Sequence, residues 1–259
     1  MLPTDAERPA EDRRSARAAA RPVLFASDVH LSGARPGMVA AFLRFLEQDA
    51  RGASALYILG DLFDLWVGDD DPDPVNLRAM EALARLARTG VAVRLMHGNR
   101  DFLFGEDGAQ HAGVELIGDP TVIDLFGTPT LLMHGDTLCT DDTPYLRARA
   151  RYRRPWVLSG FLALPRAVRV AIGRHFRAKS ERSKRVTAPT IMDVNDAAVA
   201  DALRRAGCAR LIHGHTHRPA RHELTVDGRA CERFVLADWY TRGSYLRADP
   251  DGLRAVDLA

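Results

Sequence analysis

Residues 55–64, ALYILGDLFD, hold the pattern that decides the fold. A short apolar run typical of a buried strand ends at Gly60, and the polar side chain of Asp61 follows at once. An apolar run followed by such a polar side chain occurs at five places, four of them with a glycine beside the ligand. Together they carry seven side chains of metal-binding types: Asp28 and His30 (FASDVH), Asp61 (ILGDLFD), Asn99 (MHGNRD), His134 (LLMHGD), and His215 and His217 (LIHGHTH). Because open α/β sheets bind ligands beyond the carboxyl ends of their strands, we expect the seven side chains to meet at one edge.

The donor atoms of this set are oxygen and nitrogen without a thiolate, which favours Mn²⁺, Fe or Zn²⁺ over a soft metal. Seven ligands are too many for one tetrahedral site and match two ions that share a carboxylate. Asp61 is the expected bridge, since a carboxylate can bind two cations and an imidazole nitrogen cannot. Two such ions, roughly 3.5–4 Å apart, lower the pKa of a water between them and make it a nucleophile for phosphate esters. The remaining ligands are expected to divide into Asp28, His30 and His217 for one ion, and Asn99, His134 and His215 for the other.

A single Asp or His at a strand end is more often a cap or a satisfied polar residue than a metal ligand. Here five motifs occur together, in the order D-x-H, G-D, G-N-x-D, H-G-D and G-H-x-H, and they resemble those of the calcineurin-like metallophosphoesterase superfamily. The resemblance implies an α/β fold in which a two-sheet sandwich is flanked by helices. The alternation of strand and helix patterns along the chain indicates a similar architecture, with helices near 38–50 and 75–89 and hairpin turns near 127–129 and 227–228.

The first 21 residues mix five Arg with four acidic residues and lack the hydrophobic stretch of a secretory signal. We expect residues 1–21 to be a disordered extension and residues 22–259 to form the metallophosphoesterase domain. No run of about 18 apolar residues occurs, so no membrane-spanning helix is expected. Three cysteines without a spacing motif fit a reducing, cytoplasmic setting.

A basic and apolar segment interrupts the domain at about residues 141–190, between the motifs of His134 and His215. Residues 141–187 hold 13 Lys and Arg against three Asp and Glu, and Pro155 and Pro165 divide the apolar residues into short helices. We expect a helical cap beside the site that covers an amphiphilic substrate. The alternative is a solvated basic cap that packs a small core of its own.

Arg100 follows Asn99 at a position where many members of the superfamily carry histidine. A histidine can protonate a leaving alkoxide, whereas arginine stays protonated and pairs with phosphate oxygens. A site without an acid suits a leaving group that departs as an anion, such as a phosphate released from a diphosphate. The expected reaction is pyrophosphate cleavage, with the catalytic residues Asp61, Asn99, Arg100 and His134. Asp101 is expected either to orient a neighbour or to be a structural turn carboxylate.

Further motifs narrow the resemblance. FLRFL, LCTDD, LALP, IMDVN and LIHGHTHRP, within about residues 22–257, are similar to the UDP-2,3-diacylglucosamine diphosphatases of bacterial lipid A biosynthesis. The resemblance implies hydrolysis of UDP-2,3-diacylglucosamine at its α-phosphorus to UMP and 2,3-diacylglucosamine 1-phosphate (lipid X), with Mn²⁺, taken as two ions per chain. It also implies peripheral attachment to the cytoplasmic face of the inner membrane, with the cap holding the acyl chains. Neither a nucleic acid nor an obligate protein partner is expected.

The same resemblance implies a set of substrate contacts: Asn99, Arg100, Asp142, Ser180 and His215. The family often has an Asn and a Lys in the turn after that serine, and the ungapped positions here are Lys184 and Thr187. Both residues depart from the family pattern, so the contacts to the head group stay open at these positions.

Two other functions remain open at this point. One is a nucleotide pyrophosphatase of the same superfamily that acts on soluble substrates, which the amphipathic segment disfavours. The other is a non-catalytic scaffold with the phosphoesterase fold, which the complete set of seven ligands disfavours.

Overall fold

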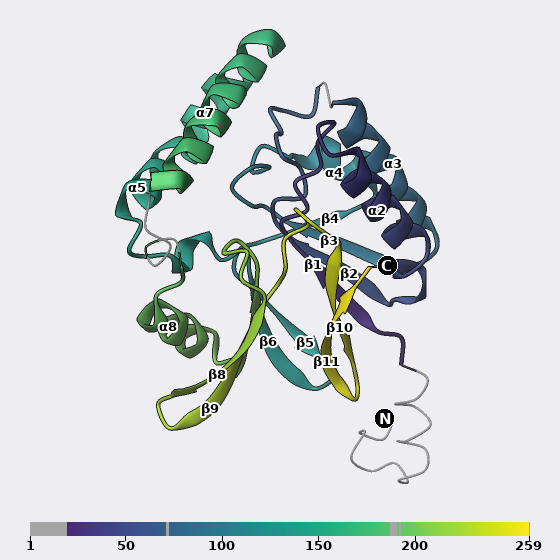
Figure 1. Cartoon of the computed structure of the whole chain (residues 1–259), viewed down its shortest axis with the longest axis vertical. Coiled ribbons are helices and arrows are strands. Elements are labelled where there is room, and N and C mark those ends of the chain that lie inside the picture. Colours follow the sequence, from purple (N-terminus) through teal and green to yellow (C-terminus); the bar gives the residue numbers. More distant parts are fainter. Residues whose placement is uncertain (1–19, 71–72, 187–190, 192, 259) are drawn as a thin grey trace.

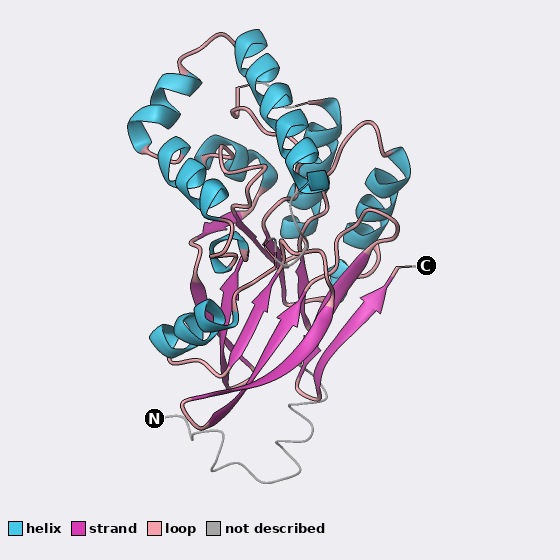
Figure 2. Cartoon of the chain, turned by 60° about the vertical axis from the view of Figure 1, so that its left-hand side comes forward, coloured by secondary structure: helices cyan, strands magenta, loops and turns pink. Residues whose placement is uncertain are grey.

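The computed structural model describes residues 20–70, 73–186, 191 and 193–258. Two mixed sheets pack face to face, and helices cover their outer faces (Figure 1 and Figure 2). The expected α/β two-sheet sandwich is therefore confirmed. Nearly all of the expected N-terminal extension lies outside the described residues. Within those residues, no helix is both long and apolar enough to cross a membrane.

The six-stranded sheet has the order β11-β10-β1-β2-β3-β4. β1 to β4 are parallel, and β10 pairs antiparallel with both β1 and β11. The strands are β1 (Val23–Ala26), β2 (Ala55–Leu59), β3 (Ala92–Met96), β4 (Glu115–Ile117), β10 (Ser244–Asp249) and β11 (Gly252–Asp257). The elements between them are α2 (Pro36–Glu47), η2 (Ala50–Gly52), α3 (Pro74–Arg88) and α4 (Glu106–Ala112).

The five-stranded sheet has the order β5-β6-β7-β9-β8, with β6, β7 and β9 parallel and an antiparallel strand at each edge. Its strands are β5 (Thr121–Leu125), β6 (Thr128–Met133), β7 (Arg210–His213), β8 (Ala220–Val226) and β9 (Arg229–Val235). The expected hairpin turns join β5 to β6 and β8 to β9. A short η3 (Asp136–Leu138) follows β6, and α8 (Asp196–Ala206) precedes β7.

Three buried layers hold the sandwich together. Alternate side chains of β1 face opposite ways, so Leu24 packs with helices α2 and α3 while Phe25 lies between the sheets. Leu132 and Ile212 of the other sheet meet Phe25 in that middle layer. On the far side, Leu203 of α8 packs on the outer face of the five-stranded sheet. The strand ends are therefore held on rigid elements.

Three helices form the cap: α5 (Thr143–Tyr152), α6 (Pro155–Leu162) and α7 (Arg166–Val186). They lie beyond the strand ends, at the top of Figure 1. The expectation of only short helices is wrong for α7, which spans 21 residues. No proline interrupts the sequence between Pro165 and Pro189, and its many Arg, Ala and Lys residues favour helix.

The cap is docked on the loop that follows β2. Arg169 is only 2% exposed, donates to the carbonyl oxygen of Val67 at 2.6 Å, and forms an ion pair with Asp70. Farther along α7, Nε of Arg177 lies 2.7 Å from Oδ2 of Asp64. Part of the basic charge of the cap therefore binds carboxylates of the segment that follows β2.

The apolar residues of the cap do not close into a core of their own. Trp156 on α6 is 68% exposed, and Phe176 on α7 is 60% exposed. Val168 is also exposed, at 43%. The alternative of a self-contained basic cap does not account for these side chains.

Candidate metal centre

Each of the seven candidate ligands follows the carboxyl end of a strand. β1, β2 and β3 belong to the six-stranded sheet, and β6 and β7 belong to the five-stranded sheet. The strands lead to the ligands in the order β1 to Asp28 and His30, β2 to Asp61, β3 to Asn99, β6 to His134, and β7 to His215 and His217. Hydrogen bonds from the backbone amides of Asp28 and His30 to the carbonyls of Gly60 and Asp61 tie the first two strand ends together.

One group of ligands is formed by Asp28, His30 and His217, whose ligand atoms all lie within 4.8 Å of one another. Nε2 of His217 is 3.2 Å from Oδ1 of Asp28, and Nε2 of His30 is 3.9 Å from the same oxygen. Asp28 and His30 are fully enclosed, at 0% and 1% exposure. These three side chains can hold one divalent ion.

A second group gathers around Asn99. Its Oδ1 lies 3.2 Å from Nε2 of His134 and 3.1 Å from Nδ1 of His215. Nδ1 of His134 is 2.9 Å from the carbonyl oxygen of Leu59, which can only accept. Nδ1 therefore carries the proton, and Nε2 is left as the ligand atom, an orientation common for metal-binding histidines.

Asp61 lies between the two groups. Its Oδ2 is 3.7 Å from Nε2 of His30, and its Oδ1 is 4.0 Å from Nε2 of His134. The ligand atoms of Asp28, Asp61 and His134 also lie within 4.8 Å of one another, so Asp61 connects the two groups. The two oxygens of Asp61 thus face different histidines, as a bridging carboxylate requires.

The backbone at the ligands adopts a conformation that costs energy. Seven described non-glycine residues have a positive φ, and five of them are candidate ligands: Asp28 (52°), His30 (49°), Asp61 (55°), His215 (70°) and His217 (56°). The other two, Phe126 and Asp227, lie in the hairpin turns. Strained conformations of this kind persist where the surroundings hold them, and they cluster at functional sites.

Two glycines let the ligand loops approach closely. A Cβ at Gly98 would lie 2.1 Å from Oδ1 of Asp61 and 2.3 Å from its backbone nitrogen. A Cβ at Gly214 would lie 2.3 Å from Oδ2 of Asp28. Both carboxylates are therefore pressed against backbone, and any larger residue would displace them.

Burial and charge shift the pKa values at this site. Burial raises the pKa of Asp61 to about 7; the charge of His134 opposes this rise, and the carboxylates of Asp101 and Asp28 add to it. Burial lowers the pKa of His134, but the carboxylates of Asp61, Asp136 and Asp28 outweigh it and raise the value to about 9. Burial opposes ionisation of Asp28, yet the hydrogen bond and charge of His217 hold its pKa well below the usual range.

The pKa of His215 shifts in the opposite direction to that of His134, because burial and the positive charge of His134 lower it to about 3. Imidazole nitrogens beside two buried carboxylates and an amide oxygen are the donors that divalent ions such as Mn²⁺ or Zn²⁺ accept. The distances, the burial and the donor chemistry all fit two divalent ions.

Two further carboxylates support the ligands, Asp101 of the G-N-x-D motif and Asp238 outside the five motifs. Asp101 accepts hydrogen bonds from the amides of Leu62 and Gly98, both at 2.8 Å, so it shapes the turns that carry Asp61 and Asn99. Of its two expected roles, the structure favours the turn carboxylate. Asp238 also supports a ligand, since its Oδ2 is 3.3 Å from Nδ1 of His217.

A further chain of hydrogen bonds supports the last ligand loop. Nη1 of Arg233, on β9, donates to Nε2 of buried His213 at 3.2 Å, and Nδ1 of His213 donates to the carbonyl oxygen of Gly214 at 2.9 Å. Burial lowers the pKa of His213 to about 4, which keeps this ring neutral. The backbone that presents His215 is therefore fixed from the side of β9.

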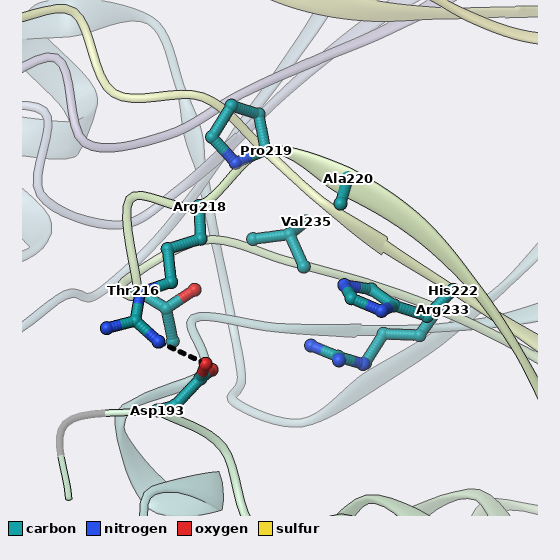
Figure 3. A pocket seen from close by; sticks show the side chains of 8 residues that line it. All are labelled: Asp193, Thr216, Arg218, Pro219, Ala220, His222, Arg233 and Val235. Carbon is teal, nitrogen blue, oxygen red and sulfur yellow. Dashed lines mark hydrogen bonds and ion pairs between the residues drawn. The ribbon is translucent and has the colours of Figure 1, made fainter. Parts of the chain in front are cut away.

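Arg233 also lines a hollow of about 230 Å³ beside this loop (Figure 3). An ion pair between Arg218 and Asp193 lies on one side, and Arg233 and His222 lie on the other. Asp193 belongs to the IMDVN motif, and Asn195 of that motif caps α8 and donates to Asp141 of LCTDD at 3.3 Å. The two motifs therefore meet in space.

The residues expected to contact the substrate lie on several different elements. Arg100 is buried, and its amide donates to Oδ1 of Asp61 at 2.8 Å. Asp142 caps α5 by accepting from the amide of Tyr145 at 3.1 Å. Ser180 and Lys184 lie on α7, and Thr187 falls outside the described residues.

The cap reaches the Asn99 side of the centre. Nη2 of Arg153 donates to the carbonyl oxygen of Gly98 at 2.6 Å, and its guanidinium lies 5.2 Å from the ring of Phe102. The ring centroids of Tyr145 and His215 are 6.1 Å apart. The cap therefore borders the second ligand group.

Residues 21–219 match the model of the calcineurin-like phosphoesterase family. The chain is 50% identical over 227 residues to a UDP-2,3-diacylglucosamine hydrolase of Aeromonas salmonicida, with 88% of this chain and 89% of that protein covered. It is 51% identical over 230 residues to the protein of the same name from Cellvibrio japonicus, with 89% and 96% covered. A solved archaeal phosphodiesterase aligns over 92% of this chain and 99% of its own, at 12% identity and a TM-score of 0.46.

Proposed function

The chain belongs to the calcineurin-like phosphoesterase family, and we propose that it hydrolyses UDP-2,3-diacylglucosamine at the α-phosphorus. Water adds to that phosphorus, and the products are UMP and 2,3-diacylglucosamine 1-phosphate. The observation that carries the proposal is the pair of ligand groups on either side of Asp61, in a chain half identical to hydrolases of this name. We propose two Mn²⁺ as the ions.

When bound, the two ions supply a lowered pKa for the attacking water and positive charge for the phosphoryl oxygens. The roles of the residues follow from their positions. Asp61 faces both groups and so bridges them, while Asn99 joins the second group through a neutral oxygen. His134 is oriented by the carbonyl of Leu59.

Arg100 binds the substrate rather than protonating it. Its backbone amide is anchored to Asp61, which places the residue beside the ligand groups. A guanidinium remains charged at neutral pH and pairs with phosphate oxygens. The departing group, a sugar phosphate, leaves as an anion and needs no proton from the protein. This assignment favours a diphosphate over an ester with an alkoxide leaving group.

The cap provides the surface for the lipid part of the substrate. Residues 141–190 are inserted into the domain formed by residues 22–259, and the exposed Trp156, Val168 and Phe176 provide apolar surface for two acyl chains. Arg153 and Tyr145 bring this surface to the edge of the metal centre. We propose that the protein works at the cytoplasmic face of the inner membrane as a peripheral protein, because its substrate is a lipid.

The central test measures UMP released from UDP-2,3-diacylglucosamine in the presence of Mn²⁺. Asp61→Ala is expected to abolish turnover and bound metal, and Asn99→Ala to raise mainly the Mn²⁺ requirement. Asp107→Ala, which removes an exposed carboxylate on α4, is the matched control and should leave both unchanged. Absence of UMP release from the unaltered protein, or two ions retained by Asp61→Ala, would overturn the assignment.

A second test separates the lipid from the nucleotide. Trp156→Ser together with Phe176→Ser should raise the KM for long-chain substrate but not for a short-chain analogue, since each methylene withdrawn from water contributes about 0.8 kcal/mol. Val122→Ser, at a half-exposed site on β5, is the control. Equal KM values for long and short chains in the unaltered protein would favour a soluble diphosphate as the substrate.

A further inference from the structure

One face of α5 lies against the loops that carry the second ligand group. That group consists of Asn99, His134 and His215. Tyr145, Arg149 and Arg153 are spaced four residues apart, so their side chains lie on the same side of the helix and its C-cap. The hydroxyl of Tyr145 and Nε of Arg149 both donate to Oδ2 of Asp136, each at 2.6 Å. Nη2 of Arg153 donates to the carbonyl oxygen of Gly98, also at 2.6 Å.

The contact with Asp136 acts next to the ligand His134. Asp136 follows this histidine by two residues, and its side chain is fully enclosed, at 0% exposure. A buried carboxylate is costly unless it is paired, and Tyr145 and Arg149 supply a hydrogen bond and a positive charge. The ring of Tyr145 also lies near that of His215, with 6.1 Å between the centroids and 30° between the planes. This part of α5 therefore holds the loop of one ligand and borders the ring of another.

The contact of Arg153 acts on the peptide group that carries Asn99. Because a peptide group is planar, a hydrogen bond to the carbonyl oxygen of Gly98 also fixes the orientation of the amide of Asn99. The amide of Gly98 itself donates to Oδ1 of Asp101 at 2.8 Å. The guanidinium of Arg153 lies 5.2 Å from the ring centroid of Phe102. Both peptide groups that flank Gly98 are therefore fixed, one by the turn carboxylate and the other by the cap.

We propose that Arg153 is a positioning residue for the metal ion of the second group and acts through the Gly98–Asn99 peptide group. Tyr145 supports the same ion through Asp136. This inference rests on the proposed function, which supplies two divalent ions. Hydrogen bonds around the ligands set how well their atoms converge on an ion, and loss of such a partner lowers metal affinity by roughly 10- to 100-fold. The cap is then a part of the metal centre as well as a cover for the lipid.

The experiment titrates the full chain with Mn²⁺ in the absence of substrate and follows binding by calorimetry and by electron paramagnetic resonance. Arg153→Met keeps most of the side-chain length and removes the donor to Gly98. It should weaken the ion of the second group by roughly 10- to 100-fold and leave the other ion unchanged. At an Mn²⁺ concentration that fills both sites of the unaltered protein, the variant should show the spectrum of an isolated ion in place of that of a coupled pair.

Three further variants separate positioning from other effects. Arg151→Met is the matched control, because it removes an exposed arginine from the opposite side of α5 and should leave both constants unchanged. Arg169→Met loosens the cap at α7 instead and should also leave both constants unchanged, so a general loosening of the cap is distinguished. Tyr145→Phe deletes a single hydroxyl and should weaken the ion of the second group about tenfold. Thermal unfolding of each variant, followed by circular dichroism, checks that the chain is folded.

The two binding constants decide the outcome. An unchanged constant for the ion of the second group, in either Arg153→Met or Tyr145→Phe, overturns the positioning role, and so does equal weakening of both ions. A single bound ion in the unaltered protein at saturating Mn²⁺ also overturns it. Constants that depend on Arg153 in a protein that releases no UMP from the UDP-lipid would uphold the positioning role and refute the proposed reaction. Release of UMP with constants that do not depend on Arg153 would do the reverse.

Discussion

Gly98→Ala tests how closely the centre depends on backbone contact. The added Cβ would lie 2.1 Å from Oδ1 of Asp61 and 2.3 Å from its backbone nitrogen, more than 1 Å inside ordinary contact at 3.4 Å. The backbone of Gly98 cannot shift without breaking a hydrogen bond, because its amide donates to Asp101. The same carboxylate accepts a hydrogen bond from the amide of Leu62 in the turn that carries Asp61. The carboxylate of Asp61, which lies between the two ligand groups, must therefore shift by about 1 Å.

A misplacement of about 1 Å at a reacting centre costs on the order of 100-fold in rate. Overpacking of the turn costs a further 1–3 kcal/mol or so of stability. We expect kcat on the UDP-lipid to fall by about that factor and the Mn²⁺ requirement to rise, with kcat measured at saturating Mn²⁺ and the thermal midpoint recorded alongside. Gly37→Ala, at a helical glycine with open space around it, is the control and should leave turnover unchanged. Turnover within twofold of the unaltered protein in Gly98→Ala would refute the close-contact argument.

Three further predictions address the cap, the supporting arginine and the leaving group. Arg169→Met should loosen the cap, because each hydrogen bond from the guanidinium to a carbonyl contributes at least about 1.5 kcal/mol. KM for the lipid should then rise about tenfold, while the Mn²⁺ affinity, measured by titration, stays constant. Arg233→Met leaves Nε2 of His213 without its donor and should raise the Mn²⁺ requirement about tenfold, whereas a changed KM with normal Mn²⁺ affinity would contradict the role. The assignment of Arg100 predicts far slower hydrolysis of a phosphodiester with an alkoxide leaving group than of the UDP-lipid, and comparable kcat/KM on both would reveal another acid.

The strand ends were predictable because the signal is local. An apolar run followed by a polar side chain, often with glycine beside it, is contained in about ten residues, and it placed Asp61 and His134 at one edge of the fold. Asp238 obeys the same rule, since it follows β9, which is parallel to β7. It was missed because the run before it reads as one arm of a hairpin.

The docking of the cap was not predictable in this way. Arg169 and Val67 are 102 positions apart, and nothing in either segment marks the other as its partner. The basic composition indicated a charged cap without marking any one arginine, whereas the structure buries Arg169 against a carbonyl and a carboxylate. Compositional patterns report charge, and they do not report which charges become enclosed by long-range packing.

The ligands come from two sheets, and this has a thermodynamic consequence for the whole molecule. The proposed ions would join β1, β2 and β3 to β6 and β7 across the layer that contains Phe25 and Ile212. An ion present at 100 times its dissociation constant stabilises the joined state by about 2.7 kcal/mol. Linkage is reciprocal, so the proposed ions and the contact between the two sheets stabilise each other by the same coupling free energy. A substitution far from any ligand that populates a state with the sheets apart therefore lowers the apparent metal affinity.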